Sequence, residues 1–346
     1  MIKIIKMKKQ IFVLVSLFVL TYSCKQDNTT TTAEQETSSI SDPLPSWNDG
    51  KTKDEIIAFV KKVTTEGTQD FVPVEDRIAT FDNDGTLWAE QPIYFQLFFA
   101  LDQIKVLAPE HPEWKTTEPF KSVLEDDMKG VLKSGKEGLL KIAMASHANI
   151  DAEDFKSAVK TWMATAKHPR FNQPYNAVVY QPMLELMTYL EANGFTNFIV
   201  SGGDIDFMRA WATETYGIPS HRIVGSTVEA EYDNTDGKAS VIRLPGVVLA
   251  DRGDGKPIGI YRHIGKKPIF AAGNSDGDLE MLHYTDANAH PSLKLYVHHT
   301  DETREWAYDR DSPIGELNKG LDEAMAKNWT IANMKNDWNT VFSFEK

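Results

Sequence analysis

The chain has 346 residues, of which 41% are hydrophobic and 25% charged, so it can bury a core and is unlike a disordered chain. It carries 37 Lys and Arg against 50 Asp and Glu, and the net charge of −13 argues against a nucleic-acid partner, because backbone phosphates are bound by clustered cations. A single cysteine, Cys24, excludes a disulfide framework and a cysteine-rich metal site.

The N-terminal segment has the order of a secretory signal. Lysines among residues 1–9 precede the apolar run Ile11–Leu20, which is shorter than the roughly 20 apolar residues that span a membrane. Cys24 follows directly after Ser23, an ending that resembles the lipobox of bacterial lipoproteins. The resemblance implies a signal peptide over 1–23, lipidation of Cys24, and an exported periplasmic or cell-surface lipoprotein whose only membrane contact is that lipid. A soluble secreted protein and an uncleaved anchor helix are the alternatives.

Residues 24–50 are predicted to be a flexible tether, because Lys25–Ser41 is rich in Thr, Ser, Gln and Glu and has almost nothing apolar to bury. From Asp54, apolar residues recur at helical spacing. The short run Arg77–Phe81 then predicts a buried strand that ends in an acidic loop. The folded part of the chain is therefore expected to open with a helix and a strand.

Residues 92–175 have a mainly helical pattern without a convincing strand, and we interpret them as an inserted cap. The later predicted elements are a helix over Met183–Asn193 closed by Gly194, a strand over Asn197–Val200, a helix over about 204–216 ending at Gly217, an extended stretch from Arg222, a hairpin through Asn234–Gly237, a short helix after Lys256, strands over Pro268–Ala272 and Leu293–His298, and a closing helix over Gly315–Ala326. This alternation predicts an α/β fold: a doubly wound parallel sheet formed by residues 51–91 and 176–346.

Polar loops follow three of the predicted strands. Asp82 and Asp84 lie at the end of the first, where two like charges are costly unless a cation such as Mg²⁺ neutralises them. The same residues also suit a simple turn, so the pair alone does not decide. Ser201-Gly202-Gly203 and Gly273–Asp278 follow two other strands. Because parallel strands bring their carboxyl ends to one edge, the three loops together favour a ligand site there.

The segment Asp82-Asn83-Asp84-Gly85-Thr86, Ser201 and the Gly273–Asp278 loop resemble motifs I, II and IV of the haloacid dehalogenase superfamily. The resemblance runs from about Arg77 to Met281. It implies that Asp82 is a nucleophile that becomes an aspartyl-phosphate, that Asp84 is the general acid and then the base, and that Ser201 and Gly202 bind the phosphate. True dehalogenases lack the second Asp, so the resemblance favours phosphoryl transfer.

The family also uses a lysine to neutralise the phosphoryl oxygens, and Lys256, Lys266 and Lys267 are the candidates. Lys256 begins a predicted helix and should lie at the carboxyl edge of the sheet. Lys266 and Lys267 immediately precede the strand Pro268–Ala272 and should lie at the opposite edge. Topology therefore favours Lys256.

The resemblance implies Mg²⁺ bound by Asp82, the main-chain oxygen of Asp84 and Asn274, with Asp278 holding Lys256 or a metal-bound water. The family commonly has an Asp where Asn274 stands. An amide oxygen can bind Mg²⁺ but adds no charge, and Asp276 is one residue that could compensate.

The length and position of the cap resemble those of the phosphoserine phosphatase branch. Its aromatic residues are candidates for the pocket or, more simply, for the cap core: Phe95, Phe98, Phe99 and Trp114. His298 and His299 are adjacent on a predicted strand and so point to opposite faces, which favours a surface or packing role over a metal pair.

The sequence thus predicts a Mg²⁺-dependent phosphatase that hydrolyses a small organic phosphate monoester. A phosphotransferase or mutase with the same intermediate, and a noncatalytic binding lipoprotein on the same scaffold, remain as alternatives.

Overall fold

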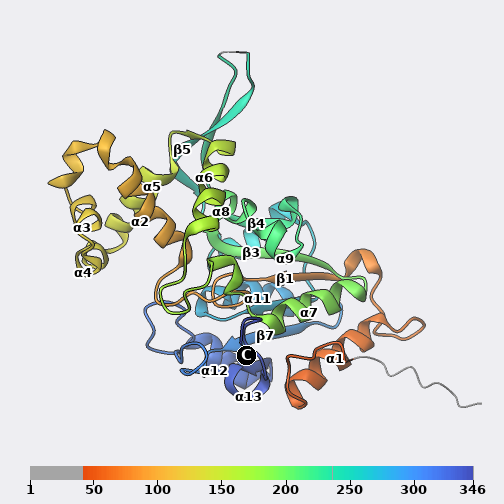
Figure 1. The fold of residues 1–346 in the computed structure, drawn as a ribbon. Helices are drawn as coiled ribbons and strands as arrows, with labels where there is room; N and C mark the ends of the chain where they lie inside the picture. The colour runs from red at the N-terminus through yellow and green to blue at the C-terminus, as the bar shows by residue number, and fades with distance from the viewer. Residues whose placement is uncertain (1–41, 236, 346) are drawn as a thin grey trace, which may run out of the picture. The chain divides into compact units, whose positions relative to one another are not determined.

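The computed structural model describes residues 42–235 and 237–345 (Figure 1). The predicted signal peptide 1–23, the lipidation site Cys24 and the segment Lys25–Ser41 lie outside these residues. Within the described ranges, each helix is too short or too polar to cross a bilayer.

An eight-stranded sheet lies at the centre of the described residues, in the order β2-β5-β4-β3-β1-β6-β7-β8. The strands are β1 (Ile78–Phe81), β2 (Ile150–Asp151), β3 (Thr196–Asp204), β4 (Ile223–Asp233), β5 (Ser240–Leu249), β6 (Phe270–Gly273), β7 (Leu293–His298) and β8 (Thr330–Asn333). From β4 to β8 the neighbouring strands pair in parallel, whereas β5 is antiparallel to β4 and β2 to β5. The predicted α/β fold with a mostly parallel sheet is confirmed.

Helices cover both faces of this sheet, which explains why its central strands are short apolar runs. Alternate strand residues such as Phe81 and Ile199 pack on one face against α1 (Lys51–Thr64) and α7 (Gln181–Ala192). Their neighbours, such as Val200, pack on the other face. That face is covered by α10 (Gly255–His263), α11 (Leu279–Asp286) and α12 (Lys319–Lys327). Both faces of the sheet are therefore shielded from solvent, and the polar side chains lie where the strands end.

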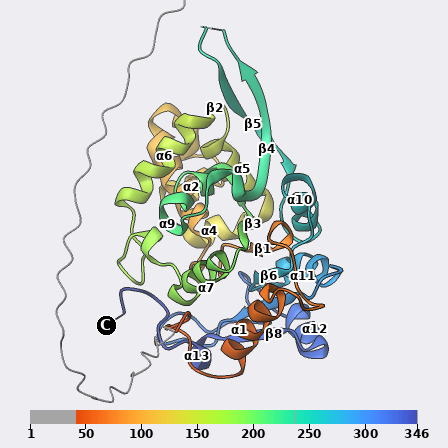
Figure 2. The same cartoon turned by 90° about the vertical axis from the view of Figure 1, so that its right-hand side faces the viewer.

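The residues between β1 and β3 are mainly helical, as expected for the inserted cap. They form α2 (Phe95–Leu107), α3 (Phe120–Leu124), α4 (Met128–Lys133), α5 (Gly135–His147) and α6 (Ala152–Thr165). Helices α2 to α5 share a small core of their own, whereas α6 packs its apolar side into the main core. The short strand β2, which the helical pattern did not predict, joins the β4–β5 hairpin. That hairpin extends from one end of the sheet (Figure 2).

The predicted C-terminal boundary of the tether, residue 50, is wrong, because residues 42–50 pack on the folded core. Leu44 and Trp47 are buried, and the Trp47 indole lies edge-on to Trp338 and donates a hydrogen bond to the Pro182 carbonyl. Two large apolar side chains among polar neighbours suffice to bind this segment to the core.

Three element boundaries also differ from the sequence prediction. The helix expected over about 204–216 is two short helices, α8 (Ile205–Arg209) and α9 (Ala212–Tyr216), and Gly217 closes the second in the left-handed conformation. Strand β8 and helix α13 (Met334–Asp337) lie beyond the predicted elements. The closing helix starts at Lys319 rather than Gly315.

Candidate active site

The end of strand β1 carries the two acids of the first predicted loop. The amide of Asp82 still donates to the Ala272 carbonyl of β6, so this residue continues the sheet. The chain then turns on the Asn83 carbonyl, which accepts from three following amides, with Gly85 at φ 74°. A side chain on Gly85 would come within 2.0 Å of Asn274, so both conformation and space require glycine there.

Lys256 extends from the first turn of α10 into the same edge of the sheet. Its ammonium group donates to Asp82 Oδ1 at 2.6 Å and to the Val200 carbonyl at 2.7 Å, and lies 2.7 Å from Asp278 Oδ1. Burial by itself would lower the pKa of Lys256, but the negative charges of Asp278 and Asp82 raise it by more than burial lowers it. The net shift is upward, so the ammonium group stays charged.

The two alternative lysines lie elsewhere. Lys266 bonds Asp76 and the Glu75 carbonyl, and Lys267 bonds the Ala287 carbonyl, on the edge where β6 begins. Of the three candidates, the structure brings only Lys256 to Asp82.

The loops after β6 and within β3 complete the edge. Asp278 Oδ2 accepts from the amides of Asn274 and Ser275, both at 3.0 Å, which fixes the carboxylate toward Lys256. Ser201 is buried next to the carbonyl that holds Lys256, and its hydroxyl accepts from the Gly203 amide. The hydroxyl proton of Ser201 therefore remains available to an anion.

Asp276 does not take the compensating position that the sequence suggested. Its two carboxylate oxygens accept from the amides of Asn318, Lys319 and Gly320 at the start of α12. The carboxylate that lies against Asn274 is instead Glu90, whose Oε1 accepts from Asn274 Nδ2 at 2.7 Å.

Burial and mutual repulsion disturb the acids of the site. Burial and the charge of Asp278 raise the pKa of Asp82 to about 8, although Lys256 lowers it. Burial raises the pKa of Asp84 to about 6. The Trp88 indole, which donates to Asp84 Oδ1 at 2.7 Å, has the opposite effect and lowers this pKa. Burial and Asp84 raise the pKa of Glu90 well above its usual range. The site therefore holds four acids, Asp82, Asp84, Glu90 and Asp278, around the one buried ammonium group of Lys256.

That charge imbalance fits a divalent cation. Among residues 42–235 and 237–345, no three Asp, Glu, His or Cys side chains form a ready metal-binding group. The donors that fit are mixed in type: a carboxylate oxygen of Asp82, the main-chain carbonyl of Asp84 and the amide of Asn274. These are hard oxygen ligands, as Mg²⁺ prefers.

A cavity of about 300 Å³ lies between this edge and the cap. Its floor includes Asp82, Asp84, Lys256 and Gly202. Its cap side is lined by Tyr94, Gln96, Leu97, Ala100, Leu139, Ala143 and His147. The predicted cap aromatics are absent from this lining: Phe95, Phe99 and Trp114 are buried in the two cores, as the packing interpretation expects.

The β4–β5 hairpin fixes the inner end of the cap. Arg243 of β5 is buried, pairs with Asp204 and Asp206, and donates to the His147 carbonyl. Burial and Arg243 lower the pKa of His147 to about 3, so its ring is neutral, and it lies 3.2 Å from the Gln96 amide nitrogen. The cavity therefore ends in neutral polar groups.

Sequence reasoning missed Glu90, Gln96, His147 and Arg252 as site residues. Arg252 lines the cavity, is exposed, and makes no ion pair with the described residues. The loop Asp251–Asp254 before Lys256 was the available signal for Arg252. Glu90 gave a weaker one, a lone acid eight positions after Asp82.

A family model described as haloacid dehalogenase-like hydrolase matches residues 79–283. No curated protein matches the sequence.

Three solved structures are among those to which this chain is similar. A conserved, functionally unknown protein from Anaerococcus prevotii is 16% identical, with 84% of this chain and 94% of that chain covered and a TM-score of 0.50. A probable phosphoserine phosphatase from Vibrio cholerae is 15% identical, with 81% and 76% covered and a TM-score of 0.36. Cytosolic 5′-nucleotidase IIIB bound to cytidine is 10% identical, with 81% and 84% covered and a TM-score of 0.39.

Proposed function

This chain belongs to the haloacid dehalogenase-like hydrolases, and we propose that it is a phosphatase that hydrolyses a small phosphate monoester through an aspartyl-phosphate on Asp82. The observation that carries the proposal is the contact of Lys256 with Asp82 at 2.6 Å beside Ser201. A buried ammonium group and a free hydroxyl proton next to a carboxylate form a site for a phosphoryl group.

In the first step, the carboxylate form of Asp82, which the charge of Lys256 favours, attacks phosphorus and forms a new P–O bond, while the bond from phosphorus to the ester oxygen breaks. Asp84 donates its proton to that departing oxygen, so the product is a neutral alcohol. A pKa of about 6 suits this role, because it brings the carboxyl closer to neutral pH, where about a tenth of Asp84 carries a proton to donate. Lys256 and Ser201 hold the equatorial oxygens of the phosphoryl group.

In the second step, Asp84 takes a proton from a water molecule, whose oxygen attacks phosphorus. The acyl phosphate bond then breaks, which regenerates the Asp82 carboxylate and releases inorganic phosphate. The Trp88 indole holds Asp84 Oδ1, so the same carboxyl group is presented in both steps.

Asp82, the Asp84 carbonyl and Asn274 would hold a Mg²⁺ ion, which when bound supplies positive charge to the phosphoryl oxygens. The mixed donor set and the excess of buried carboxylates support this assignment.

The cavity supports a small substrate. About 300 Å³ accommodates a phosphoryl group and a leaving group of modest size. The leaving group would lie against apolar side chains of α2 and α5, such as Leu97 and Ala143, and reach the polar pair Gln96 and His147.

The experiment is hydrolysis of p-nitrophenyl phosphate and a panel of metabolite monoesters by purified protein with Mg²⁺. We expect Asp82→Asn to abolish turnover and to prevent acid-stable labelling by a ³²P-phosphate ester. The matched control is Asp76→Asn, which makes the same chemical change at a surface ion pair. Full activity of Asp82→Asn would refute the mechanism, and phosphate transfer to an added alcohol in place of water would identify a phosphotransferase.

We further propose that the protein is exported and anchored by a lipid on Cys24. The support is the order of lysines, apolar run and cysteine in the sequence. Expression of Cys24→Ala should move the protein from the membrane fraction to the soluble exported fraction, and mass spectrometry of the wild type should find diacylglycerol on Cys24.

A further inference from the structure

Glu90 is a buried acid beside the motif I loop, and the two-step mechanism gives it no role. It is 2% exposed and lines the cavity. Its Oε1 accepts from Asn274 Nδ2 at 2.7 Å and from the Tyr308 hydroxyl at 2.9 Å. Its other oxygen, Oε2, accepts no hydrogen bond from the described residues, so one carboxylate oxygen is fixed by the protein and the other is left for the cavity.

The surrounding backbone is shaped to admit this carboxylate. A side chain on Gly85 would come within 2.5 Å of Glu90 Oε1, and one on Gly315 within 2.0 Å. Both glycines have positive φ, at 74° and 69°. Two separate loops thus approach the same oxygen at distances that only glycine allows.

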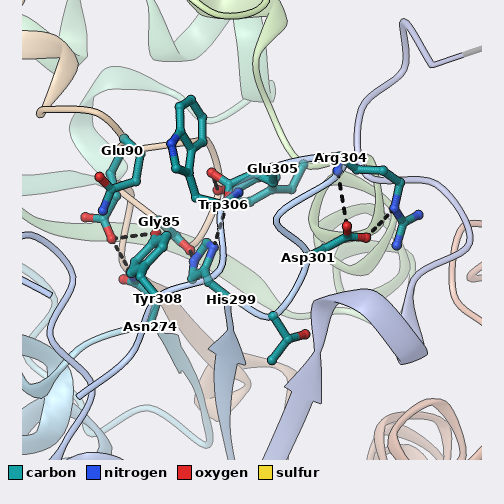
Figure 3. Close-up of polar contacts among 12 residues, drawn as sticks. Gly85, Glu90, Asn274, His299, Asp301, Arg304, Glu305, Trp306 and Tyr308 are labelled. Atoms are coloured by element: carbon teal, nitrogen blue, oxygen red, sulfur yellow. Dashed lines mark hydrogen bonds and ion pairs between the residues drawn. The ribbon is translucent and has the colours of Figure 1, made fainter. Parts of the chain in front are cut away.

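A second buried acid stabilises the loop that carries these contacts (Figure 3). His299 Nε2 lies 2.7 Å from the Gly85 carbonyl, and His299 Nδ1 lies 3.1 Å from Glu305 Oε2. Glu305 also accepts from the Tyr180 hydroxyl and the Trp306 amide, and the two ring nitrogens of His299 face Glu305 and the Gly85 carbonyl. His299 stacks on Tyr308 at 4.3 Å, which links this pair to Glu90.

We propose that Glu90 provides the divalent-cation site with the negative charge that Asn274 lacks. This inference rests on the proposed function, since the cation site is part of it. Asn274 joins the two roles, because its amide group touches Glu90 and also stands at the cation position of the loop after β6. Glu90 Oε2 binds the cation directly or through one of its water ligands, and Asn274 and Tyr308 orient the carboxylate for it.

The two acids of the loop after β6 are engaged elsewhere within residues 42–235 and 237–345. Asp278 is engaged with Lys256 and two amides, and Asp276 caps α12. Among the described residues, Glu90 is the acid whose carboxylate contacts the Asn274 side chain. In this proposal, Glu90 supplies the charge that an Asp at position 274 would otherwise supply.

The experiment measures Mn²⁺ binding to the full chain without substrate, by calorimetry and by the EPR signal of free Mn²⁺. We expect Glu90→Gln to weaken Mn²⁺ binding by about tenfold or more, because loss of a supporting carboxylate commonly has that effect at metal sites. The double variant Glu90→Gln with Asn274→Asp should bind Mn²⁺ within about threefold of the wild type, since it restores the charge at the other position. Tyr308→Phe, which keeps the charge, should weaken binding less than Glu90→Gln.

Unchanged Mn²⁺ affinity in Glu90→Gln would overturn the proposal, and so would a double variant as weak as the single one. Circular dichroism and melting curves of each variant establish that it is folded. If Glu90→Gln does not fold, a Tyr308→Phe variant with unaltered affinity would overturn the proposal instead. Because binding is measured without substrate, failure here is distinct from failure of the phosphatase mechanism, which the Asp82→Asn assay tests.

Discussion

Replacing Lys256 by Met removes the one buried ammonium group of the site while keeping most of its volume. The ammonium group contacts Asp82, Asp278 and the Val200 carbonyl, all within 2.7 Å. Removing one partner of a buried ion pair leaves the other charge unpaired and typically costs about 3–5 kcal/mol. We expect a loss of that size in the free energy of unfolding at pH 8.

The loss should depend on pH, and its sign follows from Asp82. The folded pKa of this carboxyl, about 8, is above the unfolded value of 3.8, so between these values the folded protein binds more protons and its stability falls as pH rises. Without Lys256 the folded pKa rises further, so the extra loss of stability in Lys256→Met appears where the wild-type Asp82 carboxyl begins to ionise beside the ammonium group, near pH 8. At pH 5 the Asp82 carboxyl is protonated in both proteins, and there the loss is smaller.

The assay is urea unfolding of metal-free protein at pH 5 and pH 8, followed by circular dichroism. Lys266→Met is the matched control, because its exposed ion pair with Asp76 should contribute less than about 1 kcal/mol. If Lys256→Met and Lys266→Met have the same unfolding free energy at both pH values, the description of Lys256 as the charge partner of Asp82 is wrong.

Three further outcomes follow from the same site. Asp84→Asn should slow formation of the aspartyl-phosphate from alkyl phosphates by about 10²–10⁴-fold but from p-nitrophenyl phosphate much less, because nitrophenolate leaves without a proton; equal losses in the single-turnover rate of this first step would contradict the general-acid role. Arg252→Ala should raise KM with little change in kcat if the exposed guanidinium binds the substrate, and an unaltered KM across the substrate panel would exclude this. Mg²⁺ should raise the melting temperature more at pH 8 than at pH 5, because protons compete with the cation for the Asp82 carboxylate, whose pKa is about 8; a larger shift at pH 5 would contradict the cation assignment.

The sheet and its polar edge were predictable because the signal is local. Strands β1 and β6 are buried on both faces, so each reads as an apolar run that stops where an acidic loop begins. The placement of Lys256 followed from helix direction alone. Strand β8 was not predicted from the sequence, because its residues alternate between buried and half-buried at the edge of the sheet. Over four residues this alternation is a weak pattern.

Glu90 and Asp276 could not be assigned correctly from the sequence, because their roles depend on how distant loops meet. Asp276 follows Ser275 within the predicted cation loop, but its partners are amides more than forty positions later along the chain. The contacts of Glu90 come from Asn274 and Tyr308 in the same way. For His299, the alternation of side chains along a strand predicted only that it points away from His298. The alternation did not predict that His299 is buried against the Gly85 carbonyl.

The hydrogen bond from Trp88 to Asp84 gives the enzyme an intrinsic optical probe. The indole is buried, stacks on Trp211 at 4.1 Å and donates to the carboxyl group that exchanges its proton in the mechanism we propose. Because the bond weakens when that carboxyl is neutral, the emission of Trp88 should change as the proton moves. Stopped-flow fluorescence of the wild type, with Trp88→Phe as the reference trace, would then time proton transfer within a single catalytic cycle without any added label.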